Sequence, residues 1–265
     1  MITSSSNDKI KYVRKLQSQK SVRHRDEQLV MEGVRLVEEV VRASVVPTFV
    51  LYTEALADEP RGKALLVTLR AMGGSCYAVS DSVMEDCSDT VTPQGILAVV
   101  PFPELTAPDP LTFALIADRL RDPGNLGTLL RTALAAGVEQ VFLAPGTVDF
   151  SNPKVVRSAM GAHLHLPIAD ADWDTIAATV AGCDVWLAAA GGERSYTDVD
   201  WTRRAALIVG SEAHGAGKRS RTLADGRVSI PLNPTVESLN AAVAAAVILF
   251  EAVRQRGSPP MSNAP

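Results

Sequence analysis

The sequence lacks the features that mark membrane, secreted and metal-binding proteins. No apolar run among its 265 residues reaches the ~18 residues that a membrane-spanning helix needs. Its first residues do not join a basic segment to an apolar one, so we expect no secretory signal. The cysteines are odd in number and follow no metal-ligand spacing: Cys76, Cys87 and Cys183. We therefore expect a cytoplasmic protein with reduced thiols, no membrane contact and no bound metal.

The chain also lacks a large excess of either charge sign. The net charge of −4 argues against a wholly cationic nucleic-acid binder. The first 25 residues differ, because they carry a single acid, Asp8, against seven basic residues: Lys9, Lys11, Arg14, Lys15, Lys20, Arg23 and Arg25. Such a segment is typical either of an arm that contacts phosphates or of a solvated helix face with no partner. Both interpretations stay open at this stage.

The first hundred residues alternate between helical and strand-like patterns. Apolar spacing predicts helices at 6–19, 32–42, 61–72 and 80–86, and strands at 28–31, 48–52, 75–79 and 96–100. Four prolines then fall within residues 101–110, which can hold neither a helix nor a central strand. We place a domain boundary there, after a small α/β domain.

The remainder predicts a second α/β domain built on a mainly parallel sheet. Strands are expected at 112–117, 140–144, 163–168, 184–190 and 205–209, with helices at 128–136, 152–160 and 172–181. Ligands in such folds bind beyond the carboxyl ends of the strands. Three loops are expected at those ends: 122–127, 210–217 and 231–238.

Polar residues in these loops have both structural and functional interpretations. Asn125 can cap the helix that follows it. Arg131 lies on a largely apolar helix and needs either a salt bridge to a core carboxylate or a functional role. Ser238, Leu239 and Asn240 precede an alanine-rich helix, where they form an ordinary N-cap or the wall of a ligand site. The glycine spacing is that of neither a dinucleotide fingerprint nor a Walker loop.

Three stretches in order resemble the motifs of a known family. They are 122–133 (DPGNLGTLLRTA), 207–215 (LIVGSEAHG) and 230–240 (IPLNPTVESLN). They look like the motifs of the SpoU family, the TrmH-like members of the SPOUT superfamily of RNA methyltransferases, and 154–161 (KVVRSAMG) also resembles that family. Residues 28–100, with 32–35 (EGVR) and 92–95 (TPQG), are similar to its accessory substrate-binding domain, which is of the ribosomal protein L30e type.

The resemblance implies a fold and an activity that composition alone does not. It implies a C-terminal parallel-sheet SPOUT domain with a deep trefoil knot, preceded by a small L30e-like α/β domain. The expected division is a basic helical arm at 1–27, the L30e-like domain at 28–105, the methyltransferase domain at 106–256 and a disordered tail at 257–265. The knot would form a pocket for S-adenosylmethionine, and the enzyme would be a homodimer through the C-terminal domain that methylates a ribose 2′-hydroxyl of RNA.

The resemblance also implies roles for individual residues. The cofactor would be held by backbone around Ala189, Gly210, Ile230 and Leu239, and the catalytic neighbourhood would comprise Asn125, Arg131, Glu212, Ser238 and Asn240. RNA phosphates would meet the basic residues Lys9, Lys11, Arg14, Lys15, Arg23, Arg25, Lys154 and Arg157. The accessory domain favours ribosomal RNA as the substrate. A methyltransferase acting on transfer RNA and a catalytically silent RNA-binding module of the same fold are the alternatives.

Overall fold

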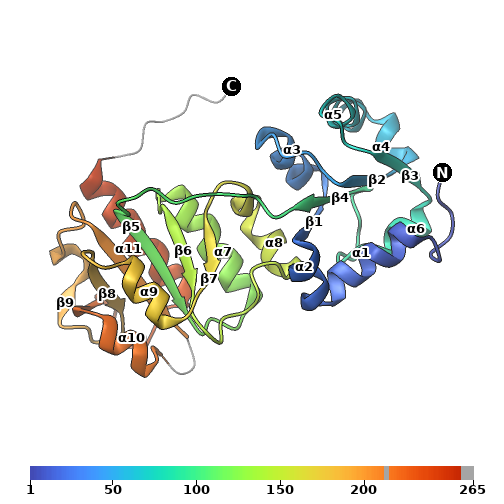
Figure 1. The fold of residues 1–265 in the computed structure, drawn as a ribbon. Coiled ribbons are helices and arrows are strands. Elements are labelled where there is room, and N and C mark those ends of the chain that lie inside the picture. The colour runs from blue at the N-terminus through green and yellow to red at the C-terminus, as the bar shows by residue number, and fades with distance from the viewer. Residues whose placement is uncertain (212–214, 258–265) are drawn as a thin grey trace. The chain divides into compact units, whose positions relative to one another are not determined.

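A computed structural model describes residues 1–211 and 215–257 of the chain. Contacts divide it into two compact units (Figure 1). Unit 1 comprises Met1–Glu104 and Asp149–His165, and unit 2 comprises Leu105–Val148 and Leu166–Pro265. Among the described residues, no helix has the length and apolarity to cross a bilayer. The chain therefore leaves unit 1, returns to it for one short segment, and leaves it again.

Unit 1 is built on a four-stranded mixed sheet with the order β1-β4-β2-β3. The strands are β1 (Gln28–Glu32), β2 (Phe49–Thr53), β3 (Cys76–Val79) and β4 (Ile96–Pro101). β4 is antiparallel to both of its neighbours, whereas β2 and β3 are parallel. The helices are α1 (Asp8–Ser18), α2 (Lys20–Asp26), α3 (Val34–Arg42), α4 (Glu54–Asp58), α5 (Pro60–Ala71), α6 (Asp81–Asp86) and α8 (Pro153–Ala159), followed by the 3₁₀ turn η1 (Ala162–Leu164).

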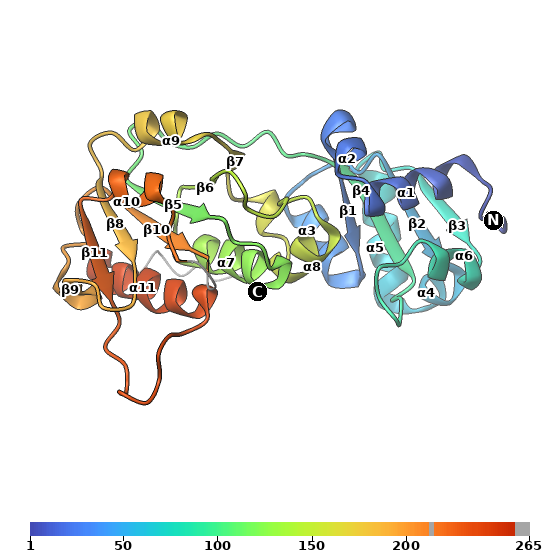
Figure 2. The same ribbon diagram turned by 90° about the horizontal axis from the view of Figure 1, so that it is seen from below.

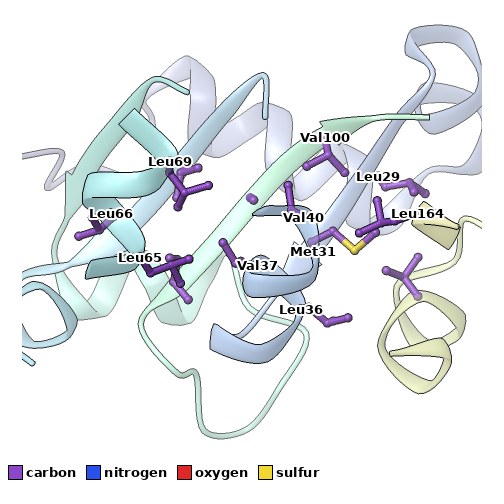
Figure 3. Packing of buried hydrophobic residues seen from close by; sticks show 14 of the residues in the cluster. Leu29, Met31, Leu36, Val37, Val40, Leu65, Leu66, Leu69, Val100 and Leu164 are labelled. Carbon is purple, nitrogen blue, oxygen red and sulfur yellow. The ribbon is translucent and has the colours of Figure 1, made fainter. Parts of the chain in front are cut away.

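Helices cover both faces of this sheet because successive strand residues point to opposite sides. Met31 and Ala98 pack with α3 and α5 on one side, where Val156 and Leu164 from the returning segment join the same core (Figure 3). On the other side the core contains Val30 and Val99 together with residues of α1, α2 and α6. Unit 1 is thus a three-layer domain that the segment 149–165 completes.

Unit 2 is built on a seven-stranded sheet with the order β7-β6-β5-β10-β8-β11-β9. The strands are β5 (Phe113–Asp118), β6 (Gln140–Leu143), β7 (Ile168–Asp170), β8 (Asp184–Ala188), β9 (Arg194–Ser195), β10 (Ala205–Gly210) and β11 (Gly226–Ser229). Every pairing between them is parallel, which confirms the predicted parallel sheet. The carboxyl ends of all seven strands therefore lie at the same edge.

The helices of unit 2 lie on both faces of its sheet. Figure 2 shows α9 (Trp173–Thr179) and α10 (Lys218–Leu223) on one face, and α7 (Pro123–Ala135) and α11 (Ala241–Arg256) on the other. A short 3₁₀ turn, η2 (Tyr196–Asp198), follows β9. α7 and α11 contact each other, so the helix that contains the first motif and the helix that follows the third motif are neighbours.

Three expectations from the sequence require correction. Residues 163–168 were expected to form a strand, but Met160 and Gly161 have positive φ and lead into the turn η1, so β7 starts only at Ile168. Asn125 does not cap α7, because Asp122 is the N-cap and accepts the backbone N–H of Asn125 at 2.7 Å.

The third correction concerns the ends of the two predicted domains. Residues 1–27 are not a separate arm, because Ile10, Val13 and Leu16 of α1 are fully buried in a core of unit 1. The segment 149–165, assigned from the sequence to the C-terminal domain, also packs in unit 1. Of the predicted tail, residues 258–265 lie outside the described part of the chain.

Candidate cofactor and active site

Unit 2 contains a cavity of about 440 Å³ beyond the carboxyl ends of β8, β10 and β11. These strands are adjacent in the sheet, so the loops that follow them converge. The volume falls in the range of roughly 300–1,000 Å³ that is usual for small-molecule sites. Ser238 lines this cavity. The four residues predicted to hold the cofactor line it as well: Ala189, Gly210, Ile230 and Leu239.

Gly210 is at a position that admits no side chain. A Cβ atom there would lie 2.7 Å from the backbone nitrogen of Ala216 and 2.9 Å from its Cα atom. The loop after β10 can fold back over the strand end only because residue 210 is a glycine. Gly215 and Ala216 line the cavity beside Gly210, so this close approach forms part of the wall.

The third motif meets the first at the start of α11. Asn240 is the N-cap of this helix, since its Oδ1 atom accepts the backbone N–H groups of Ala242 at 2.9 Å and Val243 at 3.2 Å. Its Nδ2 atom donates to Oδ1 of Asn125 at 2.9 Å. The two asparagines are 115 positions apart in the sequence, and the fold joins them at the starts of neighbouring helices. The N-cap predicted from the sequence is therefore present and has a second partner.

Arg131 lies on α7 and is exposed. It forms no ion pair with any residue in 1–211 or 215–257, so a salt bridge to a described core carboxylate does not account for it. Glu212 and the neighbouring His214 lie outside the described residues. Of the five predicted catalytic residues, the structure therefore joins Asn125 to Asn240 and places Ser238 at the cavity.

Two arginines at the cavity were missed in the sequence. Arg221 of α10 and Arg227 of β11 line it, and Arg227 donates through Nε to Glu193 at 2.8 Å. This contact raises the pKa of Arg227 and lowers the pKa of Glu193, chiefly through the hydrogen bond between them. Neither arginine belongs to a motif, and only the pairing of β11 with β8 brings Arg227 to this site.

Sequence profiles match both units of the chain. That of the SpoU rRNA Methylase family matches residues 112–250, which is more than half of the protein. That of the MRM3-like substrate binding domain matches residues 7–98. The chain belongs to the SpoU rRNA methylase family. The match to the substrate binding domain begins at residue 7 and therefore includes α1, in agreement with the packing of that helix in unit 1.

Named relatives of this SpoU protein extend over nearly the whole chain. It is 35% identical to "23S rRNA (guanosine(2553)-2'-O)-methyltransferase RlmP" of Bacillus subtilis (strain 168), over 94% of this chain and 97% of the relative. It is 32% identical to "rRNA methyltransferase 3, mitochondrial" of Mus musculus, over 88% of this chain and 69% of the relative.

Solved structures of the SpoU family have the same fold. A crystal structure of an RNA 2'-O ribose methyltransferase matches with a TM-score of 0.81 and 30% identity, covering 96% of this chain and 98% of the other. The SpoU methyltransferase AviRb from Streptomyces viridochromogenes in complex with the cofactor AdoMet matches with a TM-score of 0.83 and 29% identity, covering 94% and 98%. S-Adenosylmethionine is therefore the cofactor of this SpoU protein, and the cavity beside Gly210 has the size and position to hold it.

The basic residues of unit 1 differ in their exposure and in whether they contact neighbouring side chains. Lys11, Arg14 and Lys15 are exposed on α1, opposite its buried stripe. Lys9 is half-buried, with its ammonium group 4.6 Å from the centre of the Tyr77 ring. The remaining predicted RNA contacts are Arg25, which is exposed and bound to Asp26 at 2.6 Å; Lys154, which is exposed on α8; and Arg157, which is half-buried and bound to Asp89 at 2.7 Å.

Arg23 is removed from the predicted RNA-binding set. Its side chain is 5% exposed and donates to Asp149 Oδ2 at 2.5 Å and to Ser151 Oγ at 3.0 Å. A guanidinium enclosed in this way does not reach a phosphate, because the desolvated ion pair would have to break. Arg23 therefore holds the segment 149–165 inside unit 1.

The buried acid of this cluster has several partners. Burial by itself would raise the pKa of Asp149, but hydrogen bonds from Arg23, His24 and Ser151, with the charge of Arg23, lower it below its ordinary value. Nearby, His163 is fully enclosed, and burial lowers its pKa to about 4 despite its hydrogen bond to the Phe150 carbonyl at 2.8 Å. The imidazole is therefore neutral at physiological pH and donates through Nε2.

Proposed function

We propose that this protein transfers a methyl group from S-adenosylmethionine to a ribose 2′-hydroxyl of ribosomal RNA. The observation that carries the proposal is the cavity at the ends of β8, β10 and β11, lined by Ala189, Gly210, Ile230 and Leu239. Its relatives named above are ribosomal RNA methyltransferases, which supports the choice of substrate. Cytoplasmic location and a trefoil knot in unit 2 belong to the same proposal.

The residues around the cavity divide into those for the cofactor and those for the substrate. Ala189, Gly210, Ile230 and Leu239 would hold the cofactor through loop backbone, because their side chains are small or apolar. When bound, the cofactor supplies an electrophilic methyl group attached to a sulfonium leaving group. The protein then needs mainly to orient the ribose and accept its proton, and positioning alone can supply roughly 7–11 kcal/mol.

Arg131 is the candidate for orienting the ribose. Its guanidinium is exposed and has no ion-pair partner among the described residues, so it is available to a phosphate or a ribose oxygen. An arginine is a poor base because its pKa lies above about 12, so we assign it the binding and polarisation of the substrate. The Asn125–Asn240 hydrogen bond keeps the start of α7, the helix that carries Arg131, together with the start of α11. Ser238 and Glu212 complete the proposed catalytic neighbourhood.

The exposed cations of α1 are proposed to bind RNA phosphates. Lys11, Arg14 and Lys15 lie on the solvent face of a helix whose other face is in the core. Replacing all three by alanine should weaken RNA binding and reduce the slope of log K against log salt by about 0.7–0.9 for each lost phosphate contact. Lys63→Ala, on the exposed face of α5, is the matched control. An unchanged slope in the triple variant would show that the exposed side of α1 is a solvated face with no RNA partner.

We also propose that the protein is a homodimer through unit 2. Val243 and Phe250 are 49% and 50% exposed on α11, and they lie seven residues apart on one face of the helix. Exposed apolar residues on one face favour burial against a second copy. Sedimentation of the purified protein measures the assembly, and a monomer at all concentrations would contradict it.

Methyl transfer to purified RNA tests the function directly. Ribosomal and transfer RNA from cells that lack this protein are incubated with it and tritium-labelled S-adenosylmethionine. We expect label in ribosomal RNA, in an alkali-resistant dinucleotide, since a 2′-O-methyl group blocks cleavage at that position. Label confined to transfer RNA would support the transfer-RNA enzyme. Cofactor binding without transfer to either RNA would support a silent RNA-binding module.

A further inference from the structure

The carboxyl end of β5 holds a buried acid that neither the motifs nor the proposed function uses. The side chain of Asp118 is 2% exposed. Its Oδ2 atom accepts the backbone N–H of Gly217 at 2.6 Å and the hydroxyl of Ser220 at 2.7 Å. Gly217 ends the loop that follows β10, and Ser220 lies in α10. Asp118 therefore fixes the far end of the second-motif loop to the strand end.

The next residue, Arg119, has an unusual backbone conformation. Its φ of 58° lies in the left-handed region, which costs a residue with a side chain roughly 1–2 kcal/mol. Its N–H donates to Oγ1 of Thr147 at 3.0 Å, which holds the strained backbone in place. A glycine would adopt this φ without cost. A non-glycine residue that persists in such a conformation points to a function for its side chain.

The guanidinium of Arg119 provides that function. Nη2 donates to the carbonyl oxygen of Gly215 at 3.3 Å, and Nε lies 3.4 Å from Oδ1 of Asp118. A Cβ atom on Gly217 would lie 3.2 Å from both side chains, so the loop is packed tightly against this pair. Arg119 therefore holds Gly215, and Asp118 holds Gly217.

The residues held by Asp118 and Arg119 lie at the wall of the cofactor cavity. Gly215 donates its N–H to the Ser211 carbonyl at 2.8 Å, and Gly210 packs against Gly215 and Ala216 too closely to admit a Cβ atom. Gly210, Ser211, Gly215 and Ala216 all line the cavity. A displacement of Gly215 would therefore change the wall of the cavity directly, and a displacement of Gly217 would act through its neighbour Ala216.

We infer that Asp118 and Arg119 are positioning residues that hold residues 215–217 in the position needed to bind S-adenosylmethionine. The backbone strain at Arg119 is retained because its guanidinium fixes Gly215, which a glycine at position 119 cannot do. The inference rests on the proposed function only for the identity of the ligand. It predicts that one substitution weakens cofactor binding without lowering the stability of the fold.

Arg119→Gly is that substitution. It relieves the left-handed backbone and removes the guanidinium, so the melting temperature should stay the same or rise. The dissociation constant for S-adenosylmethionine, measured by titration calorimetry without RNA, should increase about tenfold, the equivalent of ~1.4 kcal/mol. Arg119→Ala is the matched control, because it keeps the strain and loses the guanidinium, and should lower both the melting temperature and the affinity. An unchanged dissociation constant in Arg119→Gly would overturn the inference.

Three further variants separate the contributions of the pair. Arg119→Lys retains a cation and should recover part of the lost affinity. Asp118→Asn keeps an acceptor for Gly217 and Ser220 but loses the charge facing Arg119, so it should weaken cofactor binding less than Asp118→Ala does. In turnover assays, each of these Asp118 and Arg119 substitutions should raise the KM for the cofactor and leave kcat nearly unchanged. A fall in kcat alone would contradict a positioning role. Failure of the wild-type protein to bind S-adenosylmethionine would instead refute the proposed function.

Discussion

The two units of this protein place their polar groups in different ways. Unit 1 buries an arginine, an acid and a histidine in its interior: Arg23, Asp149 and His163. Unit 2 keeps its polar motif residues at helix starts and loops: Asn125 bonds to Asn240, and Ser238 lines the cavity. In unit 1 the buried charges join α2 to a segment more than 120 residues later in the chain. One set of polar groups thus fixes the assembly of the chain, and the other is the set that we propose serves a ligand.

Tryptophan placement allows the two units to be followed separately. Trp173, Trp186 and Trp201 all belong to unit 2, and unit 1 contains none of the three tryptophans. Tryptophan fluorescence therefore reports unfolding of unit 2, whereas far-ultraviolet circular dichroism reports both units. The following substitutions test whether the two units respond separately to the loss of their polar groups.

Asp149→Ala should have the largest effect. It leaves the guanidinium of Arg23 buried without its carboxylate, and loss of one partner from a buried pair costs about 3–5 kcal/mol. Denaturant unfolding followed by circular dichroism should show early loss of unit 1, with the tryptophan transition and cofactor affinity retained. Asp8→Ala, which removes a fully exposed acid of α1, is the control and should change little. Simultaneous loss of both transitions would show that the units do not unfold independently.

His163 should make the stability of unit 1 depend on pH. Its folded-state pKa of about 4 lies below the ordinary value of 6.5, so the folded form resists protonation. Stability is therefore complete above about pH 6.5 and declines as the pH falls toward 4, by up to roughly 3 kcal/mol. His163→Asn retains a donor for the Phe150 carbonyl and cannot take up the proton. Parallel stability curves for the two proteins between pH 6.5 and 4 would contradict the assignment.

Arg131→Ala should affect chemistry in unit 2 and leave its folding intact. The side chain is exposed, so the tryptophan transition should not move. Turnover should fall at least about a hundredfold, equivalent to ~2.7 kcal/mol, if Arg131 orients the ribose. Arg131→Lys should recover only part of the activity, because lysine lacks the planar fork of arginine. Normal methyl transfer by Arg131→Ala would refute the role.

The Asn125–Asn240 pair should give the smallest effect. Asn240→Ser keeps a capping oxygen for α11 and loses the bond to Asn125, whereas Asn125→Ala removes the other partner. A double-mutant cycle on stability should return a coupling of about 0.5–1.5 kcal/mol, the usual contribution of one hydrogen bond. Additive effects of the two substitutions would show that the contact contributes nothing in solution.

Much of unit 2 could be predicted from its sequence. The apolar run at 112–117 and the asparagine at 240 each act through local chemistry, and they predicted β5 and the cap of α11 within a residue or two. The helix expected at 128–136 begins earlier, at Pro123, because Asp122 caps it. The four residues predicted to hold the cofactor were named from the family resemblance, three of them within the second and third motifs, and all four line one cavity. Arg221, Arg227, Asp118 and Arg119 carried no such signal, because their roles depend on which strands become neighbours.

The sequence by itself determined the alternation of strands and helices, the parallel sheet of unit 2, and the family, since each follows from local periodicity or from motif order. Tertiary structure alone decided where charges and segments belong. The sequence shows Arg23 as one more cation of a basic segment, and only burial against Asp149 turns it into a structural residue. Likewise, 154–161 reads as part of the methyltransferase domain, yet Val156 packs in the core of unit 1. Burial and pairing depend on contacts between residues far apart in the chain, which local patterns do not encode.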